Sequence, residues 1–535
     1  MKVELIGNND YSNPIKTVLE NRNITEDLFE LDESCVEDYS FYDNIQEAVD
    51  VALEYINSNK KIGVIVDSDT DGITSFSMVI RYFREVLNFD NFELYFHTGK
   101  QHGLSEDIII GDIDLLIIPD AGSNDIEQIQ ELKDKGIEVI ILDHHEFEKK
   151  TPCGILVNNQ TSDLIENKSF SGAGVVYKFL QCMDDTIGES KVDNYLDLLM
   201  LGNIADVMDL RSEETRYLCQ LGLENIKNPF IKALINKCSF DLEGKLNIMS
   251  IGWVIAPLIN ATIRSGTQEE KETMYKAFLS DDIIECEEAT KVCSRCKSRQ
   301  YNAVKPIMKK ISDTIEIDER DRVLCVIMDG KTNSNHNGLV ANKLISQYGI
   351  PAMVLKEVGN DYIGSMRGVE TITEDFKKDL LDSGLVNWCR GHANAGGVCF
   401  PIENKDKLIS YLNYLYKDKQ VITESSHVVD FSLSFDDVTI DMINELAEYE
   451  DEWGNGLDEP LIFMKDVMID IDLVDIKKTS IVFMSNGIKF EKKFATKILK
   501  DLFREMTIDF VNIVGRCRVD KYNNCTKIDI VDIEI

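Results

Sequence analysis

Short apolar runs alternate with helical patterns along the first third of the chain. Between Ile45 and Ile56, apolar residues recur at the i, i+3, i+4, i+7 spacing of a helix, with Asp43 or Asn44 placed to cap its start. Three buried strands are predicted at Ile62–Val66, Leu115–Ile118 and Val139–Leu142. Strands that alternate with helices in this way predict a parallel sheet covered on both faces.

The pattern changes twice further along the chain. From Gly172 to about Lys310 it is mainly helical, and strand–helix alternation then resumes at Val323–Met328. This predicts a second α/β lobe, joined to the first by a helical bridge. After Pro460 the chain has short apolar strands with aromatic residues and one helix from about Ala495 to Arg504, which is typical of a small β-barrel.

The composition is that of a globular protein. Of the 535 residues, 44% are hydrophobic and 28% are charged, and no uncharged apolar run reaches the 18 residues of a membrane span. The start of the chain lacks the basic and apolar regions of a secretory signal. We therefore expect a soluble cytoplasmic protein that makes no use of a membrane and whose thirteen cysteines are reduced.

The charge balance argues against a passive coat for nucleic acid. The 57 basic and 95 acidic residues give a net charge of −38, whereas nucleic-acid affinity comes largely from phosphate neutralisation. Two basic islands stand out: residues 291–310 carry seven basic and no acidic residues, and residues 476–521 carry eleven basic and five acidic ones. Lys291, Arg295 and Arg299 share one narrow arc of a predicted helix, which Pro306 should kink or end. On charge alone, these islands could equally be ordinary solvated faces.

Acidic and imidazole side chains follow each of the three predicted strands. Because the carboxyl ends of parallel strands meet at one edge of a sheet, we expect one cluster there, built from Asp67, Asp69, Asp71, Asp120, Asp143, His144 and His145. Carboxylates this close repel each other unless hard divalent ions such as Mg²⁺ or Mn²⁺ bind them, and imidazole favours Mn²⁺ over Ca²⁺. Asp206 can join the cluster from the helices that follow.

The plainest alternative is that each acidic residue caps the helix after its strand, a common role for a single aspartate. Three such clusters are harder to explain in this way, since two of the seven histidines stand side by side directly after a buried strand. Two ions about 4 Å apart, bridged by one carboxylate, activate water and hold a phosphoryl group for in-line attack. The residues therefore point to phosphoester hydrolysis.

The order and spacing of these residues resemble a known family. Four segments are similar to the four motifs of the DHH phosphoesterase superfamily: Asp67–Gly72, Asp120–Gly122, Asp143–His145 and Asp206. Four more resemble its second, DHH-associated lobe: Asn260–Arg264, His336–Ala341, Gly364–Arg367 and Gly391–Gly397. With Trp453–Pro460, the chain is most similar to the RecJ branch, single-strand-specific 5′→3′ exonucleases, from about Val18 to the C-terminus.

For the metal centre, the resemblance implies two Mn²⁺ or Mg²⁺ ions that share Asp120. Asp71, Asp120, His144 and Asp206 would hold one ion, and Asp69, Asp120 and Asp67 would hold the other. The resemblance also implies that His145 faces the scissile phosphate, where an imidazolium stabilises developing negative charge.

For the substrate, the resemblance implies a 5′-phosphate clamp in the second lobe. Ser365, Arg367 and Arg264 would form it, and guanidinium groups suit this role because their planar fork matches phosphate oxygens. His392, in a glycine-rich turn, would line the same cleft from the lobe opposite the metal centre. Asn260 and His336 complete the expected substrate-binding residues.

The chain departs from the family pattern at several positions. Ile65 stands where the superfamily often supplies a histidine ligand, which leaves the Asp69-side ion either to Asp67 or weakly bound. His97 and His102 occupy a loop in which RecJ proteins usually have arginine and tyrosine, so nucleotide contacts there are in doubt. Leu258 and Arg390 replace an arginine and a glycine of the family, which alters the surroundings of the clamp.

Two weaker motifs have structural explanations. Cys293 and Cys296 have the spacing of a redox motif, but without a preceding strand or a second pair we interpret them as incidental thiols on a helix. Gly172–Gly174 opens a helix and lacks a complete glycine-rich fingerprint, so close helix packing is the better interpretation than phosphate binding.

The resemblance implies five domains: an N-terminal extension (1–40), a DHH catalytic domain (41–280), a connecting basic helix (281–318), a DHH-associated domain (319–425) and an OB-fold-like nucleic-acid-binding domain (426–535). The expected activity is release of 5′-mononucleotides from the 5′ end of single-stranded DNA, in recombination, repair or replication. A single-strand binding protein or a helicase is an expected partner.

Two alternatives remain open at this point. A phosphodiesterase of short oligonucleotides or cyclic dinucleotides shares both lobes but usually lacks the region from Trp453 to Pro460 and the barrel. A catalytically silent replication scaffold of the same ancestry typically loses metal ligands, whereas Asp69, Asp71, Asp120, His144 and Asp206 are all present here. Length argues against the first and the intact ligand set against the second.

Overall fold

A computed structural model describes residues 1–97, 101–105, 108–147, 153–242, 245–315, 318, 320–329, 333–419, 426–470, 473–505, 510–520 and 525–535. The chain divides into two compact units. The first contains residues 1–257, 275–287 and 424–535, and the second contains residues 258–274 and 288–423. This division into two units does not test the boundaries of the five predicted domains, which stay a prediction.

The first unit contains a five-stranded sheet in the order β3-β2-β4-β5-β6, with every neighbouring pair parallel. Its strands are β2 (Ile62–Val66), β3 (Phe92–Phe96), β4 (Leu115–Pro119), β5 (Glu138–Asp143) and β6 (Ile155–Asn158). Every residue of β2, β4 and β6 is buried. The three strands predicted from apolar runs and their parallel arrangement are therefore confirmed.

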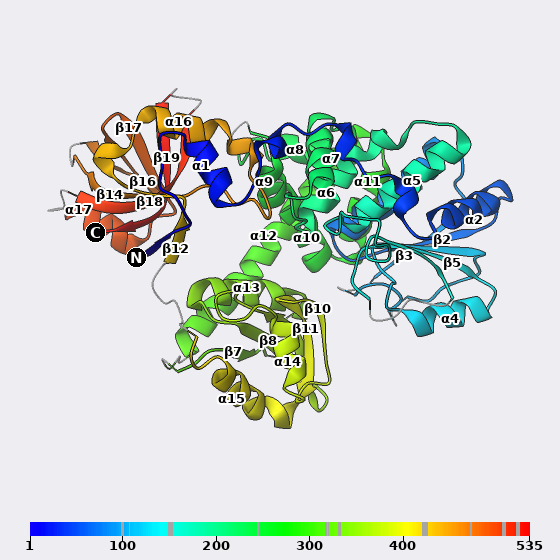
Figure 1. Ribbon diagram of the computed structural model, residues 1–535. Helices are drawn as coiled ribbons and strands as arrows, with labels where there is room; N and C mark the ends of the chain where they lie inside the picture. The colour runs from blue at the N-terminus through cyan, green and yellow to red at the C-terminus, as the bar shows by residue number, and fades with distance from the viewer. Residues whose placement is uncertain are drawn as a thin grey trace. The chain divides into compact units, whose positions relative to one another are not determined.

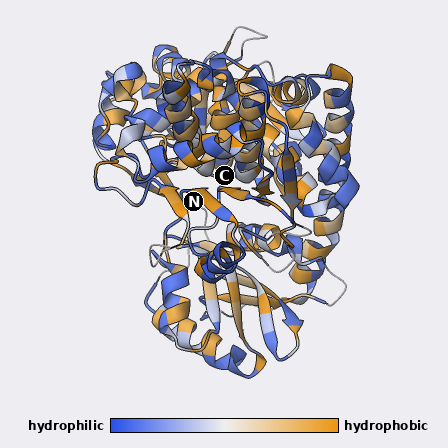
Figure 2. Ribbon diagram, turned by 90° about the vertical axis from the view of Figure 1, so that its right-hand side faces the viewer, coloured by the Kyte–Doolittle hydropathy of each residue, from blue (hydrophilic) through white to orange (hydrophobic). Residues whose placement is uncertain are grey.

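Helices cover both faces of this sheet. They are α2 (Ile45–Asn57), α3 (Thr70–Glu85), α4 (Ile126–Asp134) and α5 (Gly172–Ile187). In Figure 1, α2 and α5 lie on one side of the sheet and α4 on the other. On the α4 side, Ile65, Leu116 and Ile141 pack with Ile129 and Leu132 in one apolar core. Figure 2 shows hydrophobic and polar segments in alternation along the helices of the molecule. In α4 the buried residues are Ile129 and Leu132, as expected where one face is buried, whereas most residues of α3 and α5 are buried.

The chain is helical after β6, as predicted. The helices are α6 (Leu196–Ala205), α7 (Glu213–Glu224), α8 (Pro229–Lys237), α9 (Ile248–Ser250), a π-helix (Ile251–Ile255), α10 (Ala256–Ser265), α11 (Gln268–Leu279) and α12 (Ile283–Thr314). Within the described residues, one segment, Ile248–Ser265, has the length and apolar composition of a membrane span. Half of that segment is buried inside the protein, and core helices of soluble proteins have the same properties.

The second unit contains a second α/β lobe, as predicted. Its sheet has the order β10-β11-β9-β8-β7, in which only the β7–β8 pair is parallel. The strands are β7 (Leu324–Ile327), β8 (Ala352–Val358), β9 (Asp361–Arg367), β10 (Trp388–His392) and β11 (Ala395–Pro401). The helices are α13 (Asn337–Tyr348), α14 (Phe376–Asp382) and α15 (Lys405–Leu415).

The C-terminal part of the first unit is a seven-stranded mixed sheet in the order β13-β14-β18-β19-β17-β16-β15. Its strands are β13 (Phe431–Ser434), β14 (Ile462–Met468), β15 (Asp475–Ile476), β16 (Ser480–Ser485), β17 (Ile488–Lys493), β18 (Phe510–Asp520) and β19 (Cys525–Glu534). Its helices are α16 (Ile440–Glu448) and α17 (Lys497–Arg504). Among the described strands, no pairing joins β13 to β15, so a closed barrel is not shown.

The N-terminal segment belongs to this C-terminal part. Strand β1 (Lys2–Leu5) pairs in parallel with β12 (Ser426–Val429). Helix α1 (Pro14–Asn21) places Ile15, Val18 and Leu19 in the same apolar core as the mixed sheet. The first residues of the chain are therefore a structural part of the C-terminal sheet's core.

Two local predictions hold only in part. Asn44 stands at the start of α2, but its side chain donates to the carbonyl oxygen of Leu156 (2.9 Å) and makes no cap hydrogen bond, because a tertiary partner replaces the local one. Helix α12 does not end at Pro306 and continues to Thr314. Since proline removes only one intrahelical hydrogen bond, packing of Val304 and Ile311 into an apolar core supports the helix across it.

Candidate metal centre

The first cluster of carboxylates lies where β2 leads into α3. Asp69 is the N-cap of α3, and its side chain accepts a hydrogen bond from the Gly72 backbone (3.0 Å). Asp71 lies in the first turn of the helix, where the free N–H groups favour negative charge. Asp67 precedes the helix and is completely buried. The spacing of the three residues follows from this strand-to-helix turn.

Asp71 is held from a second element. At the start of α5, Ser171 Oγ (2.8 Å) and the backbone N–H groups of Gly172 (2.7 Å) and Ala173 (3.0 Å) all donate to its carboxylate. A Cβ atom at Gly172 would meet the side chain and backbone of Asp120. The Gly172–Gly174 motif therefore packs closely, as expected, and it also orients a carboxylate.

Asp120 and the residue after Asp206 have strained backbones. Asp120 follows β4 with φ of +63°, and its N–H donates to Leu142 of β5 (2.7 Å). Val207 has φ of +61°, which is a genuine outlier for a β-branched residue. Strain of this kind persists only where the surrounding structure enforces it, and it gathers at functional sites.

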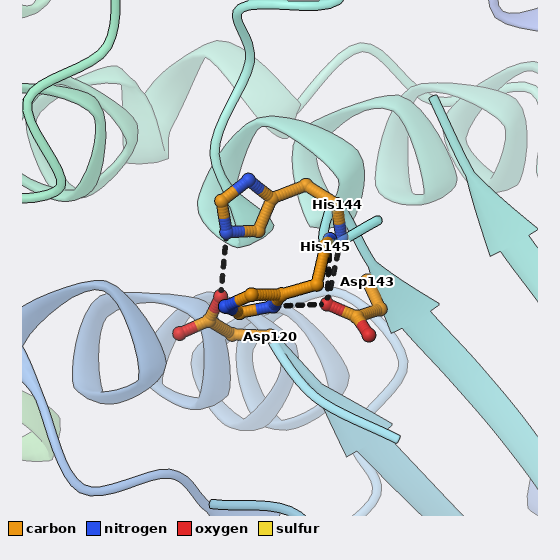
Figure 3. A group of neighbouring side chains, drawn as sticks. All are labelled: Asp120, Asp143, His144 and His145. Carbon is orange, nitrogen blue, oxygen red and sulfur yellow. Dashed lines mark hydrogen bonds and ion pairs between the residues drawn. The ribbon is translucent and has the colours of Figure 1, made fainter. Parts of the chain in front are cut away.

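His144 lies at the centre of three carboxylates, and Figure 3 shows its contact with one of them, Asp120. Its Nε2 lies 3.3 Å from Asp120 Oδ1, 3.5 Å from Asp206 Oδ2 and 3.9 Å from Asp71 Oδ2. These are the four residues that the family resemblance assigns to one ion. Their ligand atoms come from four separate segments of the chain: Asp71 lies in α3, Asp120 follows β4, His144 follows β5 and Asp206 follows α6.

His145 is oriented by Asp143, as Figure 3 shows. Its Nδ1 lies 2.8 Å from Asp143 Oδ1, and the carboxylate also accepts hydrogen bonds from the backbones of Ser123 (3.0 Å) and His144 (2.7 Å). Burial alone lowers the pKa of His145, but the charge of Asp143 and their hydrogen bond raise it to about 10. Asp143 thus fixes the orientation of the His145 ring.

The carboxylates raise one another's pKa values. Burial, and next the charge of Asp69, raise the pKa of Asp71 to about 6. Burial and the charges of Asp71, Asp69, Asp67 and Asp206 raise the pKa of Asp120 well above its usual value. The pKa of Asp206 is raised in the same way, first by burial and then by Asp71 and Asp69. Without a counter-ion this arrangement is costly.

The residues fit a divalent metal centre. Asp120 Oδ1 and Asp206 Oδ2 are buried and accept no hydrogen bond from any residue that the structure describes. Asp71, His144 and Asp206 each offer a ligand atom, and these atoms lie within 4.8 Å of one another. Oxygen ligands with imidazole suit Mn²⁺ or Mg²⁺. The geometry supports the cluster; the role of each residue stays a prediction.

Sequence reasoning assigned Asp67 and Asp69 to one ion but missed His102, whose ligand atom lies within 4.8 Å of theirs. His102 Nδ1 lies 2.5 Å from Asp67 Oδ2, and His97 Nε2 lies 3.8 Å from Asp67 Oδ1. The family pattern draws attention to these histidines only as replacements for nucleotide-binding residues. The one available signal is that two of the seven histidines follow β3, which neighbours β2.

The predicted phosphate clamp gathers within the second unit. Ser265, next to Arg264, places its Oγ 3.0 Å from His336 Nε2. A Cβ atom at Gly338 would lie 2.9 Å from Arg367 Nη2 and 3.6 Å from Ser365 Oγ. Burial, followed by the charge of Arg264, lowers the pKa values of both His336 and Arg367. Positive groups that destabilise one another in this way favour an anionic ligand.

Two further predicted residues lie near this clamp. Asn260 is one helical turn before Arg264 on α10, so both residues lie on the same side of the helix. The strand register pairs His392 with Ala395 and Ala395 with Arg367, which places His392 two strands from Arg367. The clamp thus lies along one edge of the β9–β11–β10 sheet.

The basic islands are partly neutralised by ion pairs. In the first, Lys291 pairs with Glu288 (2.5 Å) and Arg299 pairs with Glu270 (2.8 Å). In the second, Lys489 pairs with Asp520 at 2.7 Å. The charges counted from the sequence therefore overstate the positive charge that each surface presents.

Comparisons with known proteins agree with this geometry. A family model described as the DHH family, N-terminal domain, matches residues 61–203. A Bacillus subtilis (strain 168) protein named as a putative SPbeta prophage-derived single-strand DNA-specific exonuclease, YorK, is 35% identical over 100% of this chain and 98% of its own length. The chain belongs to the DHH family. Of its metal-binding candidates, Asp67, Asp69, Asp71, Asp120 and His144 lie within the matched DHH segment, and Asp206 follows it.

The likeness within the DHH family extends to RecJ. The single-stranded-DNA-specific exonuclease RecJ of Bacillus subtilis (strain 168) is 28% identical over 92% of this chain and 64% of RecJ. The crystal structure of RecJ in complex with Mn²⁺ from Thermus thermophilus superposes with a TM-score of 0.79 at 18% identity, over 100% of this chain and 79% of that one. This second comparison shows a shared fold.

Proposed function

We propose that this protein is a metal-dependent exonuclease that degrades single-stranded DNA from its 5′ end and releases 5′-mononucleotides. The observation that carries the proposal is the convergence of Asp71, Asp120, His144 and Asp206, with buried carboxylate oxygens left for a cation. The names of YorK and RecJ, single-strand DNA-specific exonucleases, supply the substrate class.

In the proposed mechanism, Asp71, Asp120, His144 and Asp206 would hold one divalent ion, and Asp69, Asp120 and Asp67 would hold a second. When bound, such ions activate water and neutralise charge on the phosphoryl group. Ser171 and the start of α5 keep the Asp71 carboxylate in place. The Asp143–His145 hydrogen bond orients the imidazole of His145 so that it can donate to the scissile phosphate.

The clamp in the second unit would select the 5′ end. Arg264 and Arg367 would bind the terminal phosphate through their guanidinium forks, with the Ser365 hydroxyl as a further donor. Arg367 is already fixed, since its Nε donates to Asn342 Oδ1 (2.7 Å) and its Nη1 to the Met366 carbonyl (2.7 Å). A fixed guanidinium loses little freedom on binding, so it recognises phosphate efficiently.

The C-terminal mixed sheet would bind the single strand as an OB-like surface. The exposed Lys493 and Lys497 would supply basic groups, and base–aromatic stacking tolerates any sequence. A single-strand binding protein or a helicase stays a predicted partner. The two alternative activities, cleavage of very short oligonucleotides and catalytically silent scaffolding, predict different outcomes in one assay.

The assay is digestion of long single strands labelled at either the 5′ or the 3′ end, with Mn²⁺, in DNA and RNA versions. We expect the 5′ label to appear at once as a mononucleotide, while the 3′-labelled strand shortens gradually. Early release of the 3′ label would contradict the polarity. Consumption of only short oligomers would favour the phosphodiesterase alternative, and no consumption of any substrate would favour the scaffold.

A further inference from the structure

The Asp69-side ion lacks the histidine that the superfamily often supplies. Ile65 occupies that position, is fully buried and packs in the apolar core on the α4 side of the sheet with Leu116 and Ile141. It therefore offers no ligand and no room for one. Asp67 and Asp69 alone would leave this ion with a ligand set made only of carboxylates.

The loop after β3 brings imidazole groups to the same place by another route. Strand β3 pairs in parallel with β2, and Phe96 lies opposite Val66, so the two strands end side by side. His97 follows β3 directly, and its Nε2 lies 3.8 Å from Asp67 Oδ1. His102 Nδ1 lies 2.5 Å from Asp67 Oδ2. Both rings thus lie at the carboxylate that precedes Asp69.

The described part of this loop is anchored from three sides. The Gly103 backbone donates to Asp67 Oδ1 (3.0 Å), and the Leu104 backbone donates to Asp125 Oδ2 (2.8 Å). Ser68 Oγ donates to the carbonyl oxygen of Gln101. Gly103 has φ of +61°, which suits glycine, and a side chain there would collide with Asp125. His102 is therefore held in place by its neighbours on both sides.

The negative charges of Asp67 and Asp69 need more than one imidazole to balance them. Asp67 is completely buried, and a ligand atom of its carboxylate lies within 4.8 Å of ligand atoms of Asp69 and His102. Asp120 Oδ1 is buried without a hydrogen bond from any described residue. The His102 side chain is 48% exposed, so an ion can reach this group from solvent. A divalent ion between Asp67, Asp69 and His102 would neutralise the negative charge of both carboxylates, which one imidazole ring cannot do.

We propose that His102 replaces the missing histidine and, with Asp67 and Asp69, binds the second divalent ion. This assignment rests on the proposed function and extends it, since it names a ligand from outside the four DHH motifs. His97 is then a positioning residue for Asp67. Because an imidazole ligand suits Mn²⁺ better than Mg²⁺, the second ion is predicted to be bound selectively as Mn²⁺.

The test is Mn²⁺ titration of the metal-free full-length protein by calorimetry, without nucleic acid. We expect two ions per wild-type chain. His102→Ala should weaken one of them by at least tenfold and leave the other within about threefold, since loss of a supporting group alone costs on the order of 10- to 100-fold. His427→Ala is the matched control, because His427 also pairs with a carboxylate (Asp532, 3.0 Å), but in the C-terminal part.

A rescue experiment separates a ligand from a positioning residue. Added 1-methylimidazole can coordinate a metal through its one free nitrogen but has no N–H to donate to Asp67. Restored affinity in His102→Ala would support coordination; lost affinity without rescue would overturn it, as would unchanged two-ion binding. Two-ion binding that does not depend on His102 leaves the proposed function standing, whereas a wild-type chain that binds no Mn²⁺ overturns both. Circular dichroism of each variant checks the fold.

Discussion

Asn455 donates a hydrogen bond from its side-chain amide to the carbonyl oxygen of Val207, the residue directly after Asp206. The Asn455 carbonyl in turn accepts a hydrogen bond from the Leu210 backbone (2.9 Å), and Gly456 packs so closely on Asp209 that a Cβ atom would collide with it. The segment Trp453–Pro460 thus fixes the strained turn that precedes Leu210 and presents a metal-binding candidate, Asp206. The C-terminal part of the chain therefore supports the metal centre directly.

Asn455→Ala is predicted to weaken the metal centre without unfolding the protein. Loss of one hydrogen bond costs about 1 kcal/mol, but release of the Val207 turn lets Asp206 move. We expect Mn²⁺ affinity at the site that contains Asp206 to fall on the order of tenfold, as measured by calorimetry. Asn225→Ala is the control, since Asn225 also donates to a backbone carbonyl, that of Leu221. Equal affinities in the two variants would contradict the coupling.

Asp120→Asn is predicted to abolish cleavage and to leave DNA binding largely intact. The amide keeps the shape of the side chain but lacks the charge that the two proposed ions would share. Loss of about a thousandfold in rate corresponds to about 4 kcal/mol, which is within what a metal ion contributes to the transition state. Single-turnover digestion and fluorescence anisotropy of a labelled single strand measure the two quantities. Turnover near the wild-type rate would refute the assignment of Asp120.

Arg367→Ala is predicted to reduce the preference for phosphorylated 5′ ends. Charge-assisted hydrogen bonds contribute about 1.5–3 kcal/mol, so the ratio of turnover on phosphorylated and hydroxyl ends should fall roughly 10- to 100-fold. Arg320→Ala serves as the control, because Arg320 is an exposed arginine of the same unit that forms an ion pair with Asp318. The clamp assignment fails if both variants keep the wild-type ratio.

The metal-free protein is predicted to lose stability as pH rises from about 4 to above 6. The pKa of Asp71 is raised to about 6 by burial and by Asp69, so the folded state binds this proton more tightly than the unfolded state. Folding then takes up a proton, and the free energy of unfolding falls as pH increases through this range. Asp120 and Asp206 act in the same direction, since both pKa values are raised.

Mn²⁺ should reverse this loss, because it binds the ionised carboxylates. Differential scanning calorimetry at about pH 5 and about pH 8, with EDTA or with Mn²⁺, measures the effect. At about a hundred times the dissociation constant, a bound ion stabilises the folded state by about 2.7 kcal/mol. We expect the rise in Tm with Mn²⁺ to be several degrees at the higher pH and small at the lower one. An equal rise at both values would contradict the account.

The sequence predicts the catalytic lobe well because its signals are local. Ile62–Val66 is fully buried in the structure, and a continuous apolar run of that length is typical of a parallel strand. Asp120 and His144 could be placed together because each follows such a strand, and parallel strands end at the same edge of a sheet. Fold and central site followed from the same pattern.

Features that depend on tertiary contacts could not be predicted in this way. The direction in which the loop after β3 turns decides that His102 meets Asp67, and no periodicity encodes that direction. Asn44 gives up a local cap for the carbonyl of Leu156, and α12 continues through Pro306 because its neighbours pack. The C-terminal strands could be predicted individually, but the order of their pairing could not, and closure into a barrel is not shown among the described strands.

The most direct test of the central claim is anomalous diffraction at the manganese edge from crystals of the protein soaked in Mn²⁺. The account predicts two peaks about 4 Å apart, one among Asp71, Asp120, His144 and Asp206, the other among Asp67, Asp69 and His102, with Asp120 shared. Crystals that show no peak at these carboxylates, at Mn²⁺ concentrations that support cleavage, would contradict it.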